Sequence, residues 1–292
     1  MAGDTLFGQL CWAIAMRRGE TEFKELLHGY TQGSPFGVVS DAFPKGFLPR
    51  ATLPDFVYGG LELDPLARKT LKRRQWLPTE GRELPYREWI TQAKAVWPSR
   101  TVTVTQNTIH RLSGTTGSGV FSPRQVEQIA FLNDTMFEIY GVIDTDRLSL
   151  EELMEAFCDI GQSGFGRDAS TGLGKFDVVS SQTIDASKSD SLDFMTLAPC
   201  APKVSDLDAS GCWTQPITRF GRHGSVLATG GKPFKSPIMF AATGAVLRIR
   251  SGTKLFHGVG IGGPDAPIST SMPKTVHQGY APLLPIHLDV RL

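Results

Sequence analysis

The residues best suited to chemistry lie in one glycine-rich stretch, residues 161–176. Its glycines leave the backbone free to adopt positive φ and let a bulky anion approach the N–H groups. Two cations and several hydroxyls share the stretch, which predicts a binding site for a phosphate-rich polymer. The glycines and cations are Gly161, Gly164, Gly166, Arg167, Gly172, Gly174 and Lys175.

The elements on either side decide what kind of site this is. Before it, apolar residues recur at helical spacing from 150 to 160, which predicts an amphipathic helix. Ser149 and Glu152 match a capping box at its start, and Gly161 occupies the place of a terminating glycine. After it, Val178 and Val179 predict a strand over 175–180. The predicted order is helix, glycine loop, strand.

This order argues against the common nucleotide motifs. A Walker A loop ends in Gly-Lys-Ser/Thr and opens a helix, whereas Phe176 follows Lys175 and Ala169 stands where that motif needs glycine. The dinucleotide spacing at 164–169 lacks a preceding strand, and the one at 258–263 runs into proline. We interpret both matches as coincidental. A plain tight connection between helix and strand remains the alternative.

Charge is segregated along a chain of 292 residues whose formal net charge is only +1. Residues 68–111 contain ten Lys or Arg against three Glu, and residues 211–292 contain nine basic against two acidic residues. Between them, residues 112–208 contain six basic and sixteen acidic residues. The basic parts suit a polyanion and the acidic part a different neighbour, unless folding interleaves the charges into a mixed surface.

Composition suits a globular cytoplasmic protein. No run approaches the roughly 20 apolar residues of a membrane span, and no signal-peptide pattern opens the sequence. The four cysteines include no C-x-x-C pair, so we expect neither a disulfide framework nor a zinc site, and no cofactor. Cys11 and Cys158 fall in apolar helical stripes and are expected to be buried.

The remaining pattern predicts a mixed α+β protein. Asp4 is expected to cap a first helix and Thr21 a second. Residues 29–67 are rich in Gly and Pro, and residues 185–235 resemble an insertion. Strands are expected at 101–109, 137–143, 240–250 and 283–290, and a helix at 85–97. The order strand, helix, loop, strand around the glycine stretch is half of a ferredoxin-like βαββαβ unit.

Five motifs in order resemble the RAMP proteins of CRISPR effector complexes. More narrowly, the chain is similar to the Cas-five-like group, the fourth subunits of type III-A (Csm) complexes. The resemblance runs through most of the chain, and its strength lies in the order of motifs that are individually weak. The motifs are Gly3-Asp-Thr-Leu-Phe-Gly-Gln-Leu-Cys-Trp12, Phe43-Pro-Lys-Gly-Phe-Leu-Pro49 with Lys69–Trp76, Asn107–Thr116, the loop Gly161–Phe176, and Gly279-Tyr-Ala-Pro-Leu-Leu-Pro285.

The resemblance implies two ferredoxin-like (RRM-like) RAMP modules, expected at 1–184 and 185–292. It implies a non-catalytic subunit of a type III effector that caps the 5′ handle of the CRISPR RNA in antiviral defence. It further implies contacts to the backbone RAMP subunit and to the large cyclase/nuclease subunit. A protruding β-hairpin thumb, which enters the guide–target duplex, is expected at about 205–237.

One departure from the family pattern concerns the N-terminus. Family members begin with a β-strand before the Asp-Thr-Leu-Phe helix, whereas this sequence starts almost at that helix. The first strand of the N-terminal module is therefore expected to be missing, which leaves a sheet edge without a partner.

RNA contacts are expected at residues that can pair phosphates, stack on bases or present a base-edge donor and acceptor. The glycine loop would cradle phosphates, Asn107 would meet a base edge, and Arg111 would stack or contact phosphate. The basic cluster after residue 68 would add longer-range attraction. Outside the loop, the expected RNA-binding residues are Asn107, His110, Arg111, Lys72, Arg73, Arg74, Arg219 and Arg222.

Two rival functions stay open. A RAMP fold can house a metal-independent endoribonuclease that processes repeat RNA with a histidine as general acid or base; His28 is the best-placed candidate, followed by His110 and His223. A pure scaffold without RNA contact is the other. No paired carboxylates, metal-ligand cluster or Ser/His/Asp arrangement supports any other chemistry.

Overall fold

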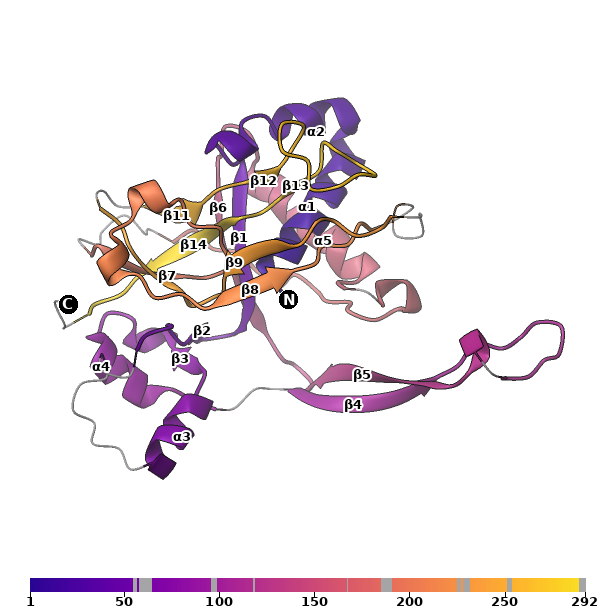
Figure 1. Cartoon of the computed structure of the whole chain (residues 1–292), viewed down its shortest axis with the longest axis horizontal. Coiled ribbons are helices and arrows are strands. Elements are labelled where there is room, and N and C mark those ends of the chain that lie inside the picture. The colour runs from indigo at the N-terminus through magenta and orange to yellow at the C-terminus, as the bar shows by residue number, and fades with distance from the viewer. Residues whose placement is uncertain are drawn as a thin grey trace.

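The computed structural model describes residues 1–54, 57, 65–95, 99–117, 119–166, 168–184, 191–224, 227, 232–250 and 254–288. It shows a two-part body of helices and short sheets, a small lobe below it, and a long hairpin that extends to one side (Figure 1). Helices and strands both contribute, as the α+β prediction required.

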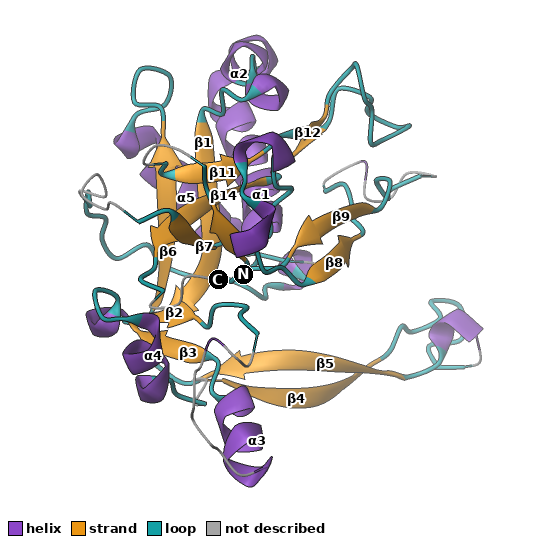
Figure 2. Cartoon of the chain, turned by 60° about the vertical axis from the view of Figure 1, so that its left-hand side comes forward, coloured by secondary structure: helices purple, strands orange, loops and turns teal. Residues whose placement is uncertain are grey.

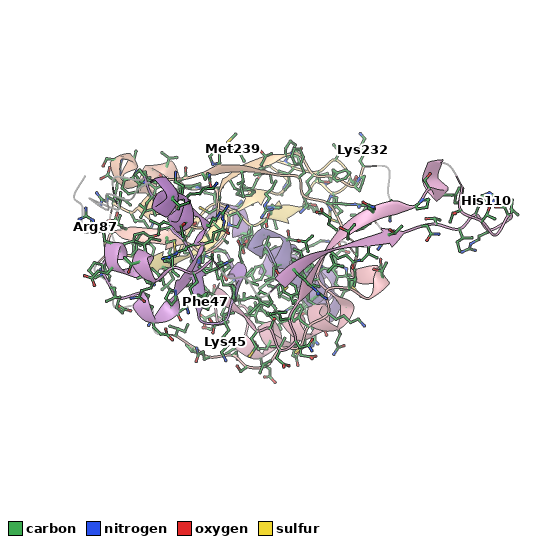
Figure 3. All side chains as sticks on the ribbon, turned by 90° about the horizontal axis from the view of Figure 1, so that it is seen from below. Lys45, Phe47, Arg87, His110, Lys232 and Met239 are labelled. Carbon is green, nitrogen blue, oxygen red and sulfur yellow. The ribbon has the colours of Figure 1, made fainter. Side chains whose placement is uncertain are left out.

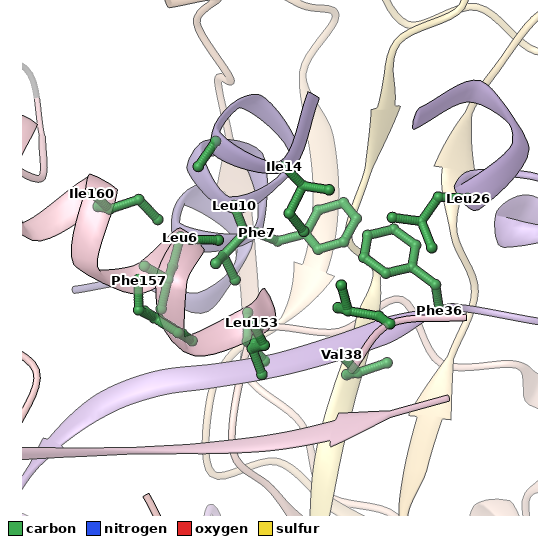
Figure 4. Packing of buried hydrophobic residues seen from close by; sticks show 14 of the residues in the cluster. Leu6, Phe7, Leu10, Ile14, Leu26, Phe36, Val38, Leu153, Phe157 and Ile160 are labelled. Atoms are coloured by element: carbon green, nitrogen blue, oxygen red, sulfur yellow. The ribbon is translucent and has the colours of Figure 1, made fainter. Parts of the chain in front are cut away.

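The N-terminal part of the body packs three helices against a two-stranded antiparallel sheet. The helices are α1 (Gly3–Arg18), α2 (Glu20–Leu26) and α5 (Leu150–Ser163), and the strands are β1 (Gly37–Pro44) and β6 (Phe137–Ile143). The core between α1 and α5 is built from Leu6, Leu10, Leu153, Phe157 and Ile160 (Figure 4).

Ion pairs at the rim join α1 to α5: Arg17 pairs with Glu155 at 2.6 Å and with Asp159 at 2.5 Å, and Arg18 pairs with Glu152. The side chain of Glu152, expected in a capping box, is thus used to hold α1.

The predicted helix ends are right in one case and wrong in three. Thr21, expected to cap the second helix, lies inside α2, whose N-cap is Gly19. Ser149 caps α5, since its Oγ accepts from the Glu152 amide at 3.1 Å. Gly161 does not end this helix: the chain stays helical to Ser163, and Gly164, at φ 97°, is the C-cap. Asp4 lies inside α1, is 5% exposed, and caps nothing, because it is engaged in a buried ion pair.

The C-terminal part of the body is a four-stranded antiparallel sheet of order β10 (Val246–Arg248), β7 (Asp193–Thr196), β14 (Tyr280–Pro285), β11 (Phe256–Gly258). Two short pairs flank it, β8 (Pro216–Arg219) with β9 (Ile238–Ala241), and β12 (Ile261–Gly262) with β13 (Val276–His277). The predicted strand over 240–250 is split, because Gly244 makes a turn at φ 85° between β9 and β10.

One side chain joins the two parts. The amide of Gln278, fully buried, accepts from the Val39 N–H at 3.0 Å and donates to the Val39 carbonyl at 2.8 Å. The side-chain amide of Gln278 thus makes with β1 the two hydrogen bonds that a residue of a neighbouring strand would make. Because the N–H and C=O of one strand residue point to the same side, this contact covers the β1 edge that faces away from β6.

The small lobe shares its core with the C-terminal sheet, because its Leu77 and Trp89 belong to the same buried cluster as Met195 and Val246. It comprises β2 (Phe47–Pro49), β3 (Trp76–Pro78), α3 (Pro65–Arg73) and α4 (Tyr86–Trp89). Trp89 is fully buried there, and its Nε1 donates to the Pro78 carbonyl at 2.7 Å. The helix predicted over 85–97 is only α4 and a 3-10 turn at Ile90–Gln92, and the segment 29–67 contains β1 and β2.

The protruding hairpin is not where we expected it. Strands β4 (Ser99–Gln106) and β5 (Arg124–Phe131) pair in full register and extend well beyond the body and the lobe (Figure 2). The expected thumb covers residues 205–237; its described first part instead lies on the body, where Leu207 and Gly211 are buried. The difference has a physical cause, since the 205–237 segment carries apolar anchors, whereas β4 is largely polar and can stay in solvent.

Two further expectations are corrected. Residues 175–180 form no strand in the structure. Phe176 and Val178 pack on the core that α1 and α5 share, but the segment pairs with no described strand. Among the described residues, a complete ferredoxin-like module is therefore not seen at this position, and β6 pairs with β1 alone. Cys158 is exposed and Cys11 half-buried, although both thiols were expected to be buried. The predicted division of the chain at residue 184 stays a prediction.

Candidate nucleic-acid interface

A groove lies between the hairpin and the body. It has a volume of about 720 Å³ and is lined by four residues of β5, by Asp168 of the glycine loop and by Arg222, which follows β8. Three segments that are distant in sequence meet there. The β5 residues are Arg124, Gln125, Val126 and Glu127.

The glycine loop is held in shape by its own backbone. The amide of Phe165 donates to the Gly174 carbonyl at 2.8 Å, and that of Phe176 to the Gly161 carbonyl at 3.2 Å. A Cβ at Gly174 would lie 2.0 Å from the Phe165 oxygen, and one at Gly161 2.2 Å from the Phe176 oxygen. Glycine at these two positions is thus required for the loop to double back on itself.

The doubled loop presents its turn outward. Gly166 and Gly172 have φ of 106° and 87°, and a 3-10 turn, Ala169–Thr171, lies between them. Among the described residues, the amides of Gly166, Leu173 and Lys175 donate no hydrogen bond. Such amides, together with the exposed Lys175, are suited to an anion. Arg167, the loop's other cation, lies outside the described residues.

The hairpin tip carries three expected RNA contacts, and none of them lines the groove. His110 is at the distal end of the hairpin, while Lys232 and Met239 lie on the body (Figure 3). The His110 ring packs edge-on against the Phe121 ring, with 4.8 Å between the ring centres. The Nδ1 atom of His110 is 3.1 Å from Ser113 Oγ. Asn107 and Arg111 flank it and are exposed.

The other expected contacts divide between two places. Lys72 and Arg73 end α3, with Arg74 directly after it, in the small lobe. Arg222 reaches the groove and lies over the Phe234 ring at 5.7 Å. The structure therefore unites the glycine loop and Arg222, and leaves the tip and the basic cluster of the lobe as separate surfaces.

Arg219 is half-buried and forms an ion pair with a buried carboxylate. Its Nε lies 3.2 Å from Oδ2 of Asp4, whose side chain is 3% exposed, and His277 Nε2 lies 3.4 Å from the same oxygen. Burial raises the pKa of Asp4, but the hydrogen bond with His277 and the charge of Arg219 outweigh it, so the pKa lies below its ordinary value. Arg219 thus anchors β8 to the start of α1.

The three histidines considered for acid–base chemistry lie in different surroundings. His28 is exposed, and its carbonyl accepts from Arg147. His223 is buried with its Nε2 2.7 Å from Ser269 Oγ, and burial together with the charge of Lys235 lowers the pKa of His223. The described part of the chain contains no group of three or more His, Cys, Asp or Glu side chains able to hold a metal ion.

Sequence analysis overlooked Arg124 and the other β5 residues of the groove. Residues 124–131 show no strict alternation of polar and apolar residues, and nothing in their sequence shows what this segment faces. Within the described residues, no helix is both long and apolar enough to cross a membrane.

Comparison with known proteins gives structural matches only. No protein-family model matches the sequence, and no curated protein matches it. The chain is similar to a chain in the Csm1–Csm4 cassette in complex with cA4, with TM-score 0.60, 18% identity, and 100% and 92% of the two chains covered. It matches the cassette in complex with pppApA at TM-score 0.57 and 18% identity, covering 99% and 92%.

A third match is to the Csm3–Csm4 subcomplex of the type III-A CRISPR-Cas interference complex, with TM-score 0.59, 14% identity, and 98% and 94% coverage. Csm4 is the component that these assemblies share. The likeness extends over nearly the whole chain and confirms, at the level of the fold, the predicted resemblance to the fourth-subunit group of RAMP proteins.

Proposed function

We propose that this chain with a Csm4-like fold is a non-catalytic subunit of a type III CRISPR effector complex and grips the 5′ handle of the CRISPR RNA. The observation that carries the proposal is the groove, in which the glycine loop, Arg222 and the hairpin strand β5 meet. Phosphates are held by the loop and its cations, and the hairpin acts as the wedge at the guide–target duplex.

The proposal includes two protein partners. The solved assemblies with this fold pair it with Csm1 in one case and Csm3 in the other. We propose that this chain bridges the large cyclase/nuclease subunit and a backbone RAMP subunit in the same way. The acidic stretch 112–208 includes the exposed Glu151 and Glu155 of α5. Glu155 is paired with Arg17, so the carboxylate of Glu151 is the one that would repel RNA, which favours protein on the helical side of the body.

Replacement of the two cations of the glycine loop tests whether this loop binds RNA. Arg167→Ala with Lys175→Ala should weaken binding of single-stranded repeat RNA about tenfold at moderate salt, because charge-assisted phosphate contacts are lost. The slope of log affinity against log salt should fall by about 0.7 for each phosphate contact removed. Fluorescence anisotropy of labelled RNA measures both quantities.

Lys45→Ala is the matched control. Lys45 is an exposed cation on a different side of the molecule from Lys232 and Met239 (Figure 3). If the loop variant binds RNA as tightly as the Lys45 variant, the chain is a scaffold without RNA contact at this loop.

Incubation with repeat RNA separates the subunit from a nuclease. We expect binding without shortening of the RNA on a denaturing gel. Cleavage by the wild-type chain that disappears in His28→Ala would instead establish the endoribonuclease.

A further inference from the structure

An aromatic strip lies on the outer face of the segments that extend β8 and β9. Phe220 is 67% exposed and Phe234 is 60% exposed, although large aromatic side chains are usually covered. Arg222 lies with its guanidinium 5.7 Å from the centre of the Phe234 ring. Two exposed rings and a cation over one of them, next to a groove, indicate a surface that binds a ligand.

The backbone explains why these three side chains share a face. Arg222 and Phe234 are cross-strand partners, and the flanking bonds run from Lys235 N–H to the Gly221 carbonyl at 2.7 Å and from His223 N–H to the Pro233 carbonyl at 2.8 Å. Side chains alternate along such a pair, so Phe220, two residues before Arg222, points to the same side.

Burial supports this alternation. Gly221 faces inward, since a Cβ there would lie 3.0 Å from Lys235 Cδ and 3.6 Å from His277 Cε1. His223, the next inward position, is 9% exposed and contacts Ser269. The strip is therefore the outer face of a pair whose inner face is fixed to the body.

The inner contacts also make the strip rigid. Arg219, directly before Phe220, pairs with the buried Asp4 of α1. A preorganised aromatic surface loses little entropy when it binds a ligand. The strip is thus a prepared surface and not a loose loop.

We propose that Phe220 and Phe234 stack on unpaired bases of the RNA whose phosphates the glycine loop holds; this inference deepens the proposed function and rests on it. Single-stranded RNA is bound by aromatic rings that take up its bases beside cations that track its backbone. The strip continues into the groove through Arg222, which lines both. The C-terminal stretch that carries the strip, residues 211–292, has nine basic against two acidic residues, which suits RNA.

The decisive variants remove the π-face and keep apolar bulk. Phe220→Leu and Phe234→Leu should each weaken binding of a fluorescein-labelled oligoadenylate about tenfold, within the range measured for loss of one stacked base. The salt slope should stay unchanged, because no phosphate contact is lost. Phe234→Tyr keeps the ring and should bind like wild type.

Three controls make the outcome specific. Met239→Ala removes a 72% exposed apolar side chain from the same part of the body and should leave affinity unchanged. An abasic oligomer of equal length should bind the Leu variants and wild type alike. Thermal unfolding identifies a variant that fails to fold. If one phenylalanine cannot be replaced for this reason, the Leu and Tyr variants of the other phenylalanine test the inference.

Failure of the inference is distinguishable from failure of the proposed function. If wild type binds oligoadenylate with a steep salt slope and both Leu variants bind equally well, the rings do not stack on RNA and the inference is overturned. Leu variants that bind RNA normally but lose a protein subunit in reconstitution would show that the strip is a protein-docking surface. If wild type binds no RNA, both the proposed function and this inference fail.

Discussion

Asp4 shows how one buried charge can hold distant segments together. It belongs to α1, yet its carboxylate meets Arg219 of β8 and His277 of β13, more than two hundred residues away. Lys235 lies near enough to Asp4 for their charges to interact. Removal of one partner from such a cluster leaves the others buried and uncompensated.

Asp4→Asn should therefore destabilise the protein by about 3 kcal/mol, and urea unfolding measures it. The pKa of Asp4 is lowered in the folded state, so its stabilisation is fully present above the unfolded-state pKa. It is lost as pH falls through the folded-state value. The variant should accordingly show a flatter decline of stability in acid than wild type. Glu25→Gln, at an exposed site on α2, is the control and should change neither quantity.

Two glycines of the same loop should respond very differently to alanine. Gly172 has φ 87° with open space at its Cβ position, so Gly172→Ala costs only the strain of about 1–2 kcal/mol. Gly174→Ala carries that strain and also forces a methyl group to within 2.0 Å of the Phe165 oxygen. We expect Gly174→Ala to raise amide hydrogen exchange throughout the loop and to abolish RNA binding. Equal effects of the two variants would contradict this packing.

The residue scale also shows what sequence could and could not reveal about the site. The glycine loop was evident, because five glycines beside cations stand out in any sequence. The functions of the individual glycines were not: Gly161 is needed for a close backbone approach inside a helix, and Gly164 supplies the positive φ that ends it. The β5 contribution to the groove was hidden because Arg124 approaches the loop only through the tertiary fold.

At the scale of elements, α5 depends on its cap. Ser149→Ala removes the acceptor for the Glu152 amide and should cost about 1 kcal/mol. Ser149→Asp restores an acceptor and adds a favourable charge at the helix N-terminus, so it should recover the loss. Thermal melts of the two variants give the comparison. A stable Ser149→Ala protein would mean that packing of α5 against α1 alone fixes the helix start.

Helix α5 was predictable since its signals are local: a cap, an apolar spacing and a glycine. The segment 175–180 was not, because its composition suits a strand while strand formation needs a neighbour to pair with. The same reason explains the misplaced thumb. Alternation predicted a strand at 101–109, but only the pairing of β4 with β5 shows that this strand belongs to a hairpin.

At the scale of the whole molecule, the hairpin tip should be dispensable for folding. Gln106 and Arg124 are register partners, so residues 107–123 can be replaced by Asn-Gly, which forms a two-residue turn. The melting temperature should stay the same, and the groove should still bind single-stranded RNA because the β5 residues that line it remain.

The shortened protein should lose only what depends on the tip, which we expect to be its effect on the guide–target duplex. A fall in melting temperature of several degrees would show that the tip contributes to the body. Loss of single-stranded RNA affinity would instead place the principal RNA contact at Asn107, His110 and Arg111.

The Gln278 amide has a consequence for growth of the sheet. Because that side chain bonds both backbone groups of Val39, the β1 edge is blocked at this residue, and among the described strands the outer edge of β6 is the one left for extension. Strand β6 has a single charged residue, Glu138, and so lacks the lysines and prolines with which natural edges resist accretion. Any strand that enlarges this sheet, from a neighbouring subunit or a second copy, must join it from that one direction.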